Sequence, residues 1–320
     1  MEHTTTLGRS DLKVPRLGVG AMTWGDAHGL ARLHPAQTAY GGAHGYDEEK
    51  RALEVSLQAG VNLFDTAAMY SGGASERRLG ELAQGRAVLI ASKFPAGFRF
   101  RAEEFPNELA ASLARLRRST IDLYQHHFPA RRMSIPTLMQ QLADAVEVGK
   151  VRAVGVSNYS AEQMREAHAA LADRGIPLAS NQVEYSLLHR QPEVDGVLDT
   201  CRELGVTLIA YTPLAGGLLT GKYSAQNRPG GFFRRILPRY RRKALDAIQP
   251  VIGLLSGIGD RYSKTPSQVA LRWLIENPVV LPIPGAKNGA QARDNAAALG
   301  FSLTSEEVDA LDRATLAWRT

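Results

Sequence analysis

Short apolar runs separated by helix-like segments dominate the pattern of hydrophobic and polar positions along the chain. Runs of this kind are typical of strands that are buried on both faces of a parallel sheet. We predict eight such strands, at Leu17–Ala21, Val61–Asp65, Val88–Lys93, Ile121–His127, Val151–Ser157, Ala179–Tyr185, Val206–Tyr211 and Val279–Ile283.

Helix signals lie between the apolar runs. Ser160 and Gln163 have the spacing of a capping box, in which each side chain bonds the backbone N–H of the other residue. Apolar residues recur at helical spacing through Ile135–Val146, the stripe expected of a helix that packs on a sheet. Strand–helix units that follow one another without a linker predict a single (β/α)₈ barrel domain over residues 1–320.

The main alternative is a doubly wound open sheet with a dinucleotide fingerprint after its first strand. Gly18, Gly20 and Gly25 do not have the G-x-G-x-x-G spacing, and no helix signal follows them directly. The barrel is therefore the preferred prediction. The stretches Thr4–Leu7 and Leu12–Val14 flank a turn-rich segment and predict a β-hairpin, which would close the N-terminal end of the barrel.

Two insertions interrupt the strand–helix rhythm. One runs from Trp24 to Tyr46 and the other from Leu214 to about Tyr240. Both follow the carboxyl ends of predicted strands, where barrel enzymes carry their active sites. Long loops in a compact domain are usually functional or mobile, so we expect these loops to shape the site.

The chain has a formal net charge of +6 and a pI near 9.5, which permits a nucleic-acid partner. Its basic residues do not form one stripe with interleaved aromatic residues, so we expect no nucleic-acid partner. The densest basic run is either a solvated face or a positive rim that attracts a phosphate-bearing cofactor. It consists of Arg234, Arg235, Arg239, Arg241, Arg242 and Lys243.

Cysteine usage and hydropathy point to the cytoplasm. The lone Cys201 cannot form an internal disulfide, and we interpret it as a small buried residue. The first residues have no signal-peptide pattern, and no apolar stretch approaches the roughly 20 residues of a membrane span. We expect a cytoplasmic protein with no membrane partner and no metal site, and the sequence indicates no oligomeric state.

Polar residues gather at the ends of consecutive predicted strands: Asp65 with Tyr70 just beyond it, Lys93, and the pair His126 and His127. A neighbouring ammonium lowers the pKa of a phenol, and a carboxylate offsets the cost of burying that ammonium. A histidine can orient a substrate oxygen. The set suits proton transfer to an oxygen that becomes an alcohol.

Several motifs together resemble those of the aldo-keto reductase family, and the resemblance covers essentially the whole chain. Each motif alone would be a weak signal, but they occur in order and at barrel spacing. The matching stretches are Phe64–Tyr70, Ala91–Phe94, Ile121–Pro129, Val151–Ser160, Asn181–Ser186, Tyr211–Tyr223 and Ile283–Asn288, with Gln291 and Asn295.

The resemblance implies a catalytic tetrad of Asp65, Tyr70, Lys93 and His127. Tyr70 would donate a proton to a carbonyl oxygen, Lys93 would lower its pKa, Asp65 would pair with Lys93, and His127 would orient the carbonyl. We choose His127 over the histidine before it because the family's histidine lies two residues before a proline. Phe128 stands where the family commonly has tryptophan.

The resemblance also implies a nicotinamide dinucleotide site. Its nicotinamide end would be held by Ser157, Asn158, Gln182 and the stacking ring of Tyr211. The pyrophosphate would lie along Pro213, Leu214, Gly216 and Leu219. The adenosine end would meet Gly285, Lys287, Asn288, Gln291 and Asn295. Lys287 favours NADPH, whereas a neutral Gln291 replaces an arginine of many relatives and keeps NADH as an alternative.

The expected function is NADPH-dependent reduction of a small aldehyde or ketone to an alcohol. The loops would supply an apolar substrate pocket lined by Trp24, Tyr40, Phe94, Phe98, Phe100 and Phe128. One alternative is a nucleotide-binding accessory or redox-sensor subunit with little turnover. Another is a barrel lyase or aldolase that uses Lys93 as a Schiff-base amine.

Overall fold

The computed structural model describes residues 3–28, 43–95, 102–129, 134–230 and 237–319. Its main sheet has eight parallel strands that neighbour one another in chain order. They are β3 (Val19–Gly20), β4 (Leu63–Asp65), β5 (Leu89–Phe94), β6 (Ile121–His126), β7 (Val151–Ser157), β8 (Leu178–Glu184), β9 (Thr207–Tyr211) and β10 (Val280–Pro282). Every predicted strand is present, and its ends differ from the prediction by two residues at most.

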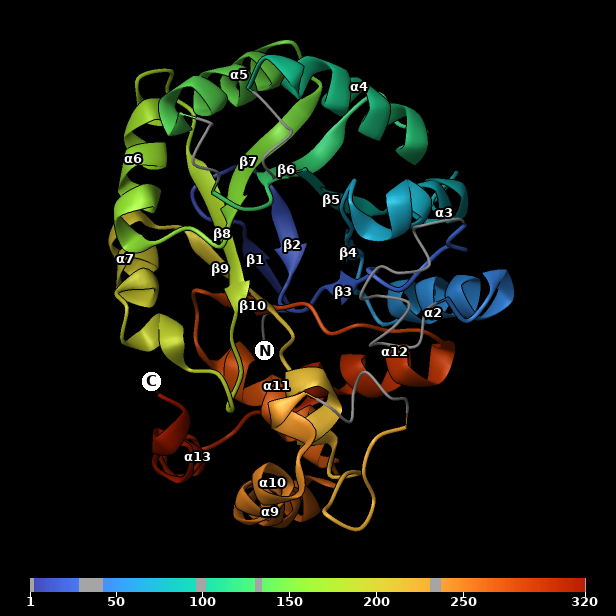
Figure 1. Ribbon diagram of the computed structural model, residues 1–320, viewed down its shortest axis with the longest axis vertical. Coiled ribbons are helices and arrows are strands. Elements are labelled where there is room, and N and C mark those ends of the chain that lie inside the picture. The colour runs from blue at the N-terminus through green and yellow to red at the C-terminus, as the bar shows by residue number, and fades with distance from the viewer. Residues whose placement is uncertain (1–2, 29–42, 96–101, 130–133, 231–236, 320) are drawn as a thin grey trace.

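Backbone hydrogen bonds join the first and last of these strands. The N–H of Gly18 donates to the carbonyl of Pro282 and the N–H of Gly20 to that of Pro284, each at 3.0 Å. Gly20 also pairs with Gly285 as a parallel bridge. The sheet thus closes into the predicted (β/α)₈ barrel, and the carboxyl ends of its strands open on one face, which is the near side in Figure 1.

The N-terminal hairpin closes the opposite end of the barrel. β1 (Thr4–Thr6) pairs antiparallel with β2 (Lys13–Pro15), as predicted. Leu7, Leu12 and Val14 are buried in an inner core with one side chain from each of the strands β4 to β10. These inner side chains are Leu63, Ala91, Leu123, Ala153, Ala179, Ile209 and Leu281.

Helices surround the barrel and bury a second core against the outer faces of the strands (Figure 1). The surrounding helices are α2 (Tyr46–Gln58), α3 (Ala74–Leu82), α4 (Phe105–Leu116), α5 (Ile135–Glu147), α6 (Ala161–Ala172), α7 (Val197–Leu204), α11 (Pro266–Glu276) and α12 (Gly289–Ala296). Outside the repeat lie α9 (Arg242–Ala247), α10 (Gln249–Tyr262) and α13 (Ser305–Ala314). Among the described residues, no helix is long and apolar enough to cross a membrane.

Local sequence signals explain where several helices begin. α6 starts with the predicted capping box of Ser160 and Gln163, and α11 and α13 start with boxes of the same kind. Each box satisfies two N–H groups that a helix end would otherwise leave without partners. Cys201 is fully buried in α7, and burial raises the pKa of its thiol to about 12. The cysteine is therefore an inert core residue, as expected.

Candidate active site

A buried lysine forms the centre of the polar cluster at the carboxyl ends of β4 and β5. The side chain of Lys93 is fully buried, and its ammonium donates to Asp65 Oδ1 at 2.6 Å, to the Thr66 carbonyl at 2.8 Å and to the Tyr70 hydroxyl at 3.2 Å. These three acceptors take the three N–H bonds of an ammonium. The lysine is thus held in one position against the phenol.

Side-chain alternation along β6 separates the two neighbouring histidines. Gln125 faces the barrel interior, where its amide lies 3.5 Å from Asp65 Oδ2. His126 points outward, and its Nδ1 lies 2.7 Å from the Tyr159 hydroxyl. Burial lowers the pKa of His126 to about 4, so this ring is neutral at pH 7. His126 therefore belongs to the core between barrel and helices, and His127 is the histidine at the mouth.

His127 lies next to Tyr70 at the barrel mouth. The two rings meet edge to face, with centroids 5.6 Å apart. The four residues of the expected tetrad thus converge on one point from β4, β5, β6 and the short helix η2 (Tyr70–Gly73). Among the described residues, no group of three metal-ligating side chains is placed to hold an ion.

Burial and charge act in opposite directions on the acid–base groups. Burial raises the pKa of Tyr70, and the Lys93 ammonium only partly offsets this. The expectation of a lowered phenol pKa is therefore wrong in its net direction, although the lysine does act in the expected sense. Burial would lower the pKa of Lys93, but Asp65 and Tyr70 outweigh it and raise that pKa. At neutral pH the pair is an ammonium beside a protonated phenol.

The residues expected at the nicotinamide end form one hydrogen-bonded network. The Asn158 amide donates to the His127 carbonyl and to Ser157 Oγ, each at 3.1 Å, and its oxygen accepts from the Tyr211 hydroxyl at 3.1 Å. Ser157 Oγ donates to the backbone carbonyl of Gln182 at 2.8 Å. Asn158 adopts a φ of 60°, a conformation that asparagine tolerates better than most residues. It joins the ends of β6, β7 and β9.

Gln182 connects this network to the tetrad, because its amide donates to Asp65 Oδ2 at 2.8 Å. Gln182 and Ser157 are each 1% exposed, whereas Asn158 and Tyr211 are partly exposed. The accessible surface at this end thus comes from Asn158 and Tyr211, and the two buried side chains support them. The sequence did not single out Gln125, although strand alternation would have placed it on the inner face of the barrel.

The segment after β9 packs closely against Tyr240, whose hydroxyl donates to the Gly216 carbonyl at 2.9 Å. Gly216 has a φ of 68°, and a Cβ there would lie 2.4 Å from the hydroxyl of Tyr240. Pro213 and Leu219 are buried and Leu214 is half-buried. The Leu219 side chain is therefore part of the core, so only backbone of this residue can meet a ligand.

The basic run between residues 234 and 243 lies only partly within the described residues. Arg234 and Arg235 lie outside the described residues, whereas Arg239 lies 3.7 Å from Glu184 at the end of β8. Arg241 caps α9, and Arg242 and Lys243 form its first turn. The described part of this run is thus partly paired and helical.

The residues expected at the adenosine end meet where α12 begins. Asn288 caps the helix by accepting from the N–H of Gln291 at 2.9 Å, and the Gln291 side chain accepts from the N–H of Lys287 at 2.9 Å. Asn295 is buried and donates to the Gly285 carbonyl at 3.2 Å. Lys287 and Asn288 remain partly exposed. The structure therefore places the five residues on α12 and on the loop just before it.

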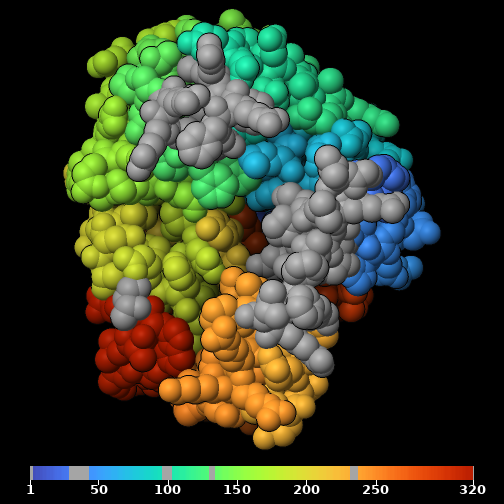
Figure 2. All heavy atoms as spheres, viewed as in Figure 1, coloured from blue at the N-terminus to red at the C-terminus, as the bar shows by residue number. Residues whose placement is uncertain are grey.

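The aromatic residues expected to line a substrate pocket divide into different environments. Trp24 is fully buried and donates to the Ala286 carbonyl at 2.7 Å, and Phe94 is fully buried too, so neither lines the mouth. Phe128 is 44% exposed and stacks on His127 with ring centroids 4.6 Å apart. Figure 2 shows a hollow near the middle of this face, between the yellow-green elements and the orange segment. The others lie outside the described residues: Tyr40, Phe98 and Phe100.

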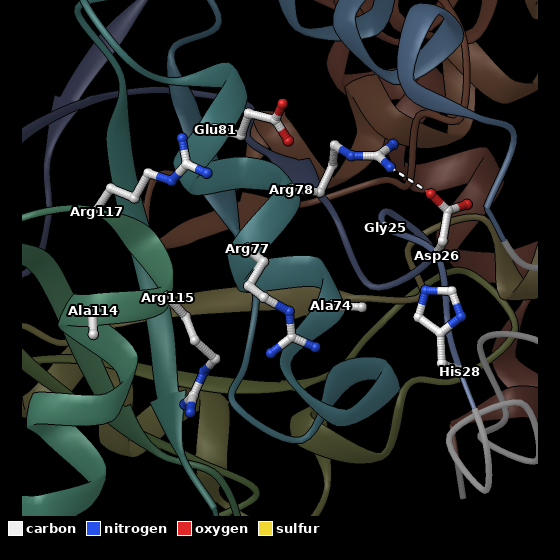
Figure 3. A pocket seen from close by; sticks show the side chains of 10 residues that line it. All are labelled: Gly25, Asp26, His28, Ala74, Arg77, Arg78, Glu81, Ala114, Arg115 and Arg117. Atoms are coloured by element: carbon white, nitrogen blue, oxygen red, sulfur yellow. Dashed lines mark hydrogen bonds and ion pairs between the residues drawn. The ribbon is translucent and has the colours of Figure 1, made fainter.

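A separate cavity of about 540 Å³ lies between α3, the end of α4 and the loop after β3 (Figure 3). Arg78 pairs there with Asp26 at 2.6 Å and with the buried Glu49, and Arg115 pairs with the buried Glu76 at 2.6 Å. No tetrad residue lines this cavity, and carboxylates already neutralise these two arginines. Its basic lining therefore stabilises the packing of α3 on its neighbours. The arginines that line it are Arg77, Arg78, Arg115 and Arg117.

Comparison with known proteins agrees with this geometry. The model of the aldo/keto reductase family matches residues 16–315. The chain belongs to the aldo-keto reductase family. It is 37% identical to a chloroplastic pyridoxal reductase of Arabidopsis thaliana, over 92% of this chain and 82% of the relative. It is 38% identical to an uncharacterised oxidoreductase of Mycobacterium tuberculosis, over 96% and 91% of the two chains.

Solved structures of aldo-keto reductases have the same architecture. A glycerol dehydrogenase of Gluconobacter oxydans superposes with a TM-score of 0.82 at 26% identity, covering 98% of this chain and 95% of that one. An aldo-keto reductase of Klebsiella pneumoniae in complex with NADPH superposes with a TM-score of 0.73 at 26% identity, with the same coverage. This chain is thus an oxidoreductase of the family by both sequence and fold.

One alternative function conflicts with the site. A lyase or aldolase that forms a Schiff base needs an accessible, neutral lysine amine. Lys93 is fully buried, has three hydrogen-bond acceptors, and has a raised pKa that keeps it protonated. Lys93 is therefore unsuited to nucleophilic attack in this conformation.

Proposed function

We propose that the protein reduces a small aldehyde or ketone to an alcohol with NADPH, and that Tyr70 gives the proton to the carbonyl oxygen. The observation that carries this proposal is the contact of 3.2 Å between the Tyr70 hydroxyl and the buried Lys93 ammonium. A phenol with a raised pKa remains protonated at neutral pH, which suits a proton donor.

The charge arrangement favours this direction of proton transfer. When Tyr70 loses its proton, the phenolate is left beside an ammonium, so the charge that forms is stabilised where it appears. Asp65 holds the lysine from the opposite side at 2.6 Å, and two glutamine amides orient the carboxylate. His127 meets the edge of the Tyr70 ring and can orient the same carbonyl oxygen.

The cofactor part of the proposal rests on how the residues fit a dinucleotide. The Asn158 side chain lies at the mouth beside the partly exposed Tyr211, and Gly216 adds no side-chain bulk to the loop after β9. At the far end, a helix N-terminus and Lys287 favour phosphate. When bound, NADPH would supply the hydride, and the protein would hold the nicotinamide against the carbonyl carbon.

Tyr70→Phe tests the proton donor. The change removes the hydroxyl but keeps the ring that packs on His127, so we expect carbonyl reduction to fall by roughly 100-fold or more. The affinity for NADPH should stay within about twofold of the wild type, because general-acid chemistry rather than binding is lost. Tyr262→Phe is the matched control, since this tyrosine bonds Glu307 on the outer helices and should leave turnover unchanged. Undiminished reduction by Tyr70→Phe would reject Tyr70 as the donor.

The same measurements separate an enzyme from an accessory or sensor subunit. The hydrogen bonds from Lys93 to Asp65 and to Tyr70 favour an enzyme. Burying an ion pair is costly, and binding a nucleotide does not require one next to a phenol. Tight NADPH binding without turnover on any of a broad panel of carbonyls would favour the sensor.

A further inference from the structure

Gln291 has a structural role at the start of α12. Its side-chain oxygen accepts from the backbone N–H of Lys287 at 2.9 Å, while its own N–H donates to the Asn288 cap at 2.9 Å. This reciprocal arrangement fixes the loop that precedes the helix. The neutral side chain of Gln291 thus shapes the loop and brings no positive charge to a 2′-phosphate.

Arg51 of α2 lies across this helix end. A Cβ on Gly289, the first residue of α12, would lie 2.7 Å from Cγ and 3.1 Å from Cδ of Arg51. The stem of the arginine therefore packs directly on the first turn of α12 at Gly289. Figure 1 shows α2 and α12 side by side at the rim of the barrel.

The charge of Arg51 is uncommitted. The side chain is exposed and, among the described residues, forms no hydrogen bond or ion pair. Glu54, one turn further along α2, already pairs with Arg86 at 3.1 Å. Its guanidinium therefore lies near a helix N-terminus with its N–H donors available, and a guanidinium can bind phosphate in a bidentate geometry.

We propose that Arg51 binds the 2′-phosphate of the cofactor and so makes the protein select NADPH over NADH. This inference rests on the proposed function, because it places the adenosine end of the dinucleotide at α12. Arg51 would act with Lys287, which supplies a point charge from the loop. An arginine on the neighbouring helix would thus replace the cation that Gln291 lacks.

Binding of NADPH and NADH to the full-length protein, followed by cofactor fluorescence, tests the inference without turnover. Arg51→Ala should weaken NADPH by roughly 10-fold or more, the loss of a charge-assisted phosphate contact, and leave NADH within about twofold. Arg51→Lys keeps the charge but loses the planar fork, so its NADPH affinity should fall between the two. Competition by 2′,5′-ADP should weaken in Arg51→Ala, whereas competition by ADP should not.

Arg293→Ala is the matched control, since Arg293 is an exposed arginine in the last turn of the same short helix. It should bind both cofactors like the wild type. Equal weakening of NADPH and NADH by Arg51→Ala, no change in NADPH affinity, or the same selective loss in Arg293→Ala would overturn the role of Arg51. Failure of the wild type to bind either cofactor would instead overturn the proposed function, and the inference with it.

Discussion

Asp65→Asn removes the negative charge that balances the buried ammonium of Lys93. Asp65 is 3% exposed, and its carboxylate accepts from Lys93 at 2.6 Å and from Gln182 at 2.8 Å. The variant leaves Lys93 with only neutral acceptors, namely the amide oxygen that replaces the carboxylate, the Thr66 carbonyl and the Tyr70 hydroxyl. An ammonium inside the barrel would then be uncompensated.

Removing one partner of a buried ion pair typically costs about 3–5 kcal/mol, so we expect a loss of this size in the free energy of unfolding. Lys93→Met should cost a similar amount, because it leaves a buried carboxylate with amide donors alone. The double variant Asp65→Asn with Lys93→Met buries no charge. It should therefore be more stable than the sum of the single losses predicts, by about 2 kcal/mol.

Urea unfolding of the four proteins at pH 7 measures this coupling, and carbonyl reduction measures function in parallel. Stability should recover in the double variant, whereas activity should remain lost, because the ammonium no longer stabilises the Tyr70 phenolate. Strictly additive losses in the free energy of unfolding would refute the buried pair. Restored activity in the double variant would refute the role of Lys93 in proton transfer.

Three further predictions concern pH and packing. The pKa of Tyr70 is raised above its ordinary value of about 10. The rate of reduction at saturating substrate should therefore stay constant through neutral pH and fall only in strong alkali. A fall in the rate near pH 7 would contradict this. Gly8→Ala should lower the free energy of unfolding in urea by about 2 kcal/mol or more, since φ is 57° and the Cβ would lie 2.4 Å from the Ala179 carbonyl oxygen. Gly60→Ala, which also has a positive φ of 77° but open space around the Cβ, should cost less. His126 has a pKa of about 4 when folded and about 6.5 when unfolded, so the unfolded state binds more protons in between. The free energy of unfolding should therefore fall by up to about 3 kcal/mol from pH 6.5 to 4. If the free energy of unfolding of His126→Leu falls as steeply over this range, the contribution of His126 is rejected.

The barrel could be predicted from the sequence because its signals are local. Each buried parallel strand is a short apolar run, and the capping box of Ser160 and Gln163 marks a helix start without reference to the rest of the chain. The strand ends differ by one or two residues because hydrogen bonding to the neighbouring strand decides them. The site residues could be placed at strand ends because the strands themselves have local signals.

Features that depend on tertiary packing were not predicted. Lys93 was expected to lower the pKa of Tyr70, but the depth of burial outweighs the ammonium. Trp24 was expected at the substrate pocket, but it is buried in the core between barrel and helices, where its indole donates to the Ala286 carbonyl. Nothing in the sequence near Arg51 indicates that it packs on a helix more than 200 residues away along the chain.

We propose that this barrel mouth binds NADPH and converts a carbonyl into an alcohol. The most direct test is a reaction of the purified protein with NADPH deuterated at the transferable position of the nicotinamide, offered with a panel of aldehydes and ketones and analysed by mass spectrometry. We expect tight NADPH binding and an alcohol that carries one deuterium on the former carbonyl carbon. No NADPH binding, or binding without any labelled alcohol, would contradict the account.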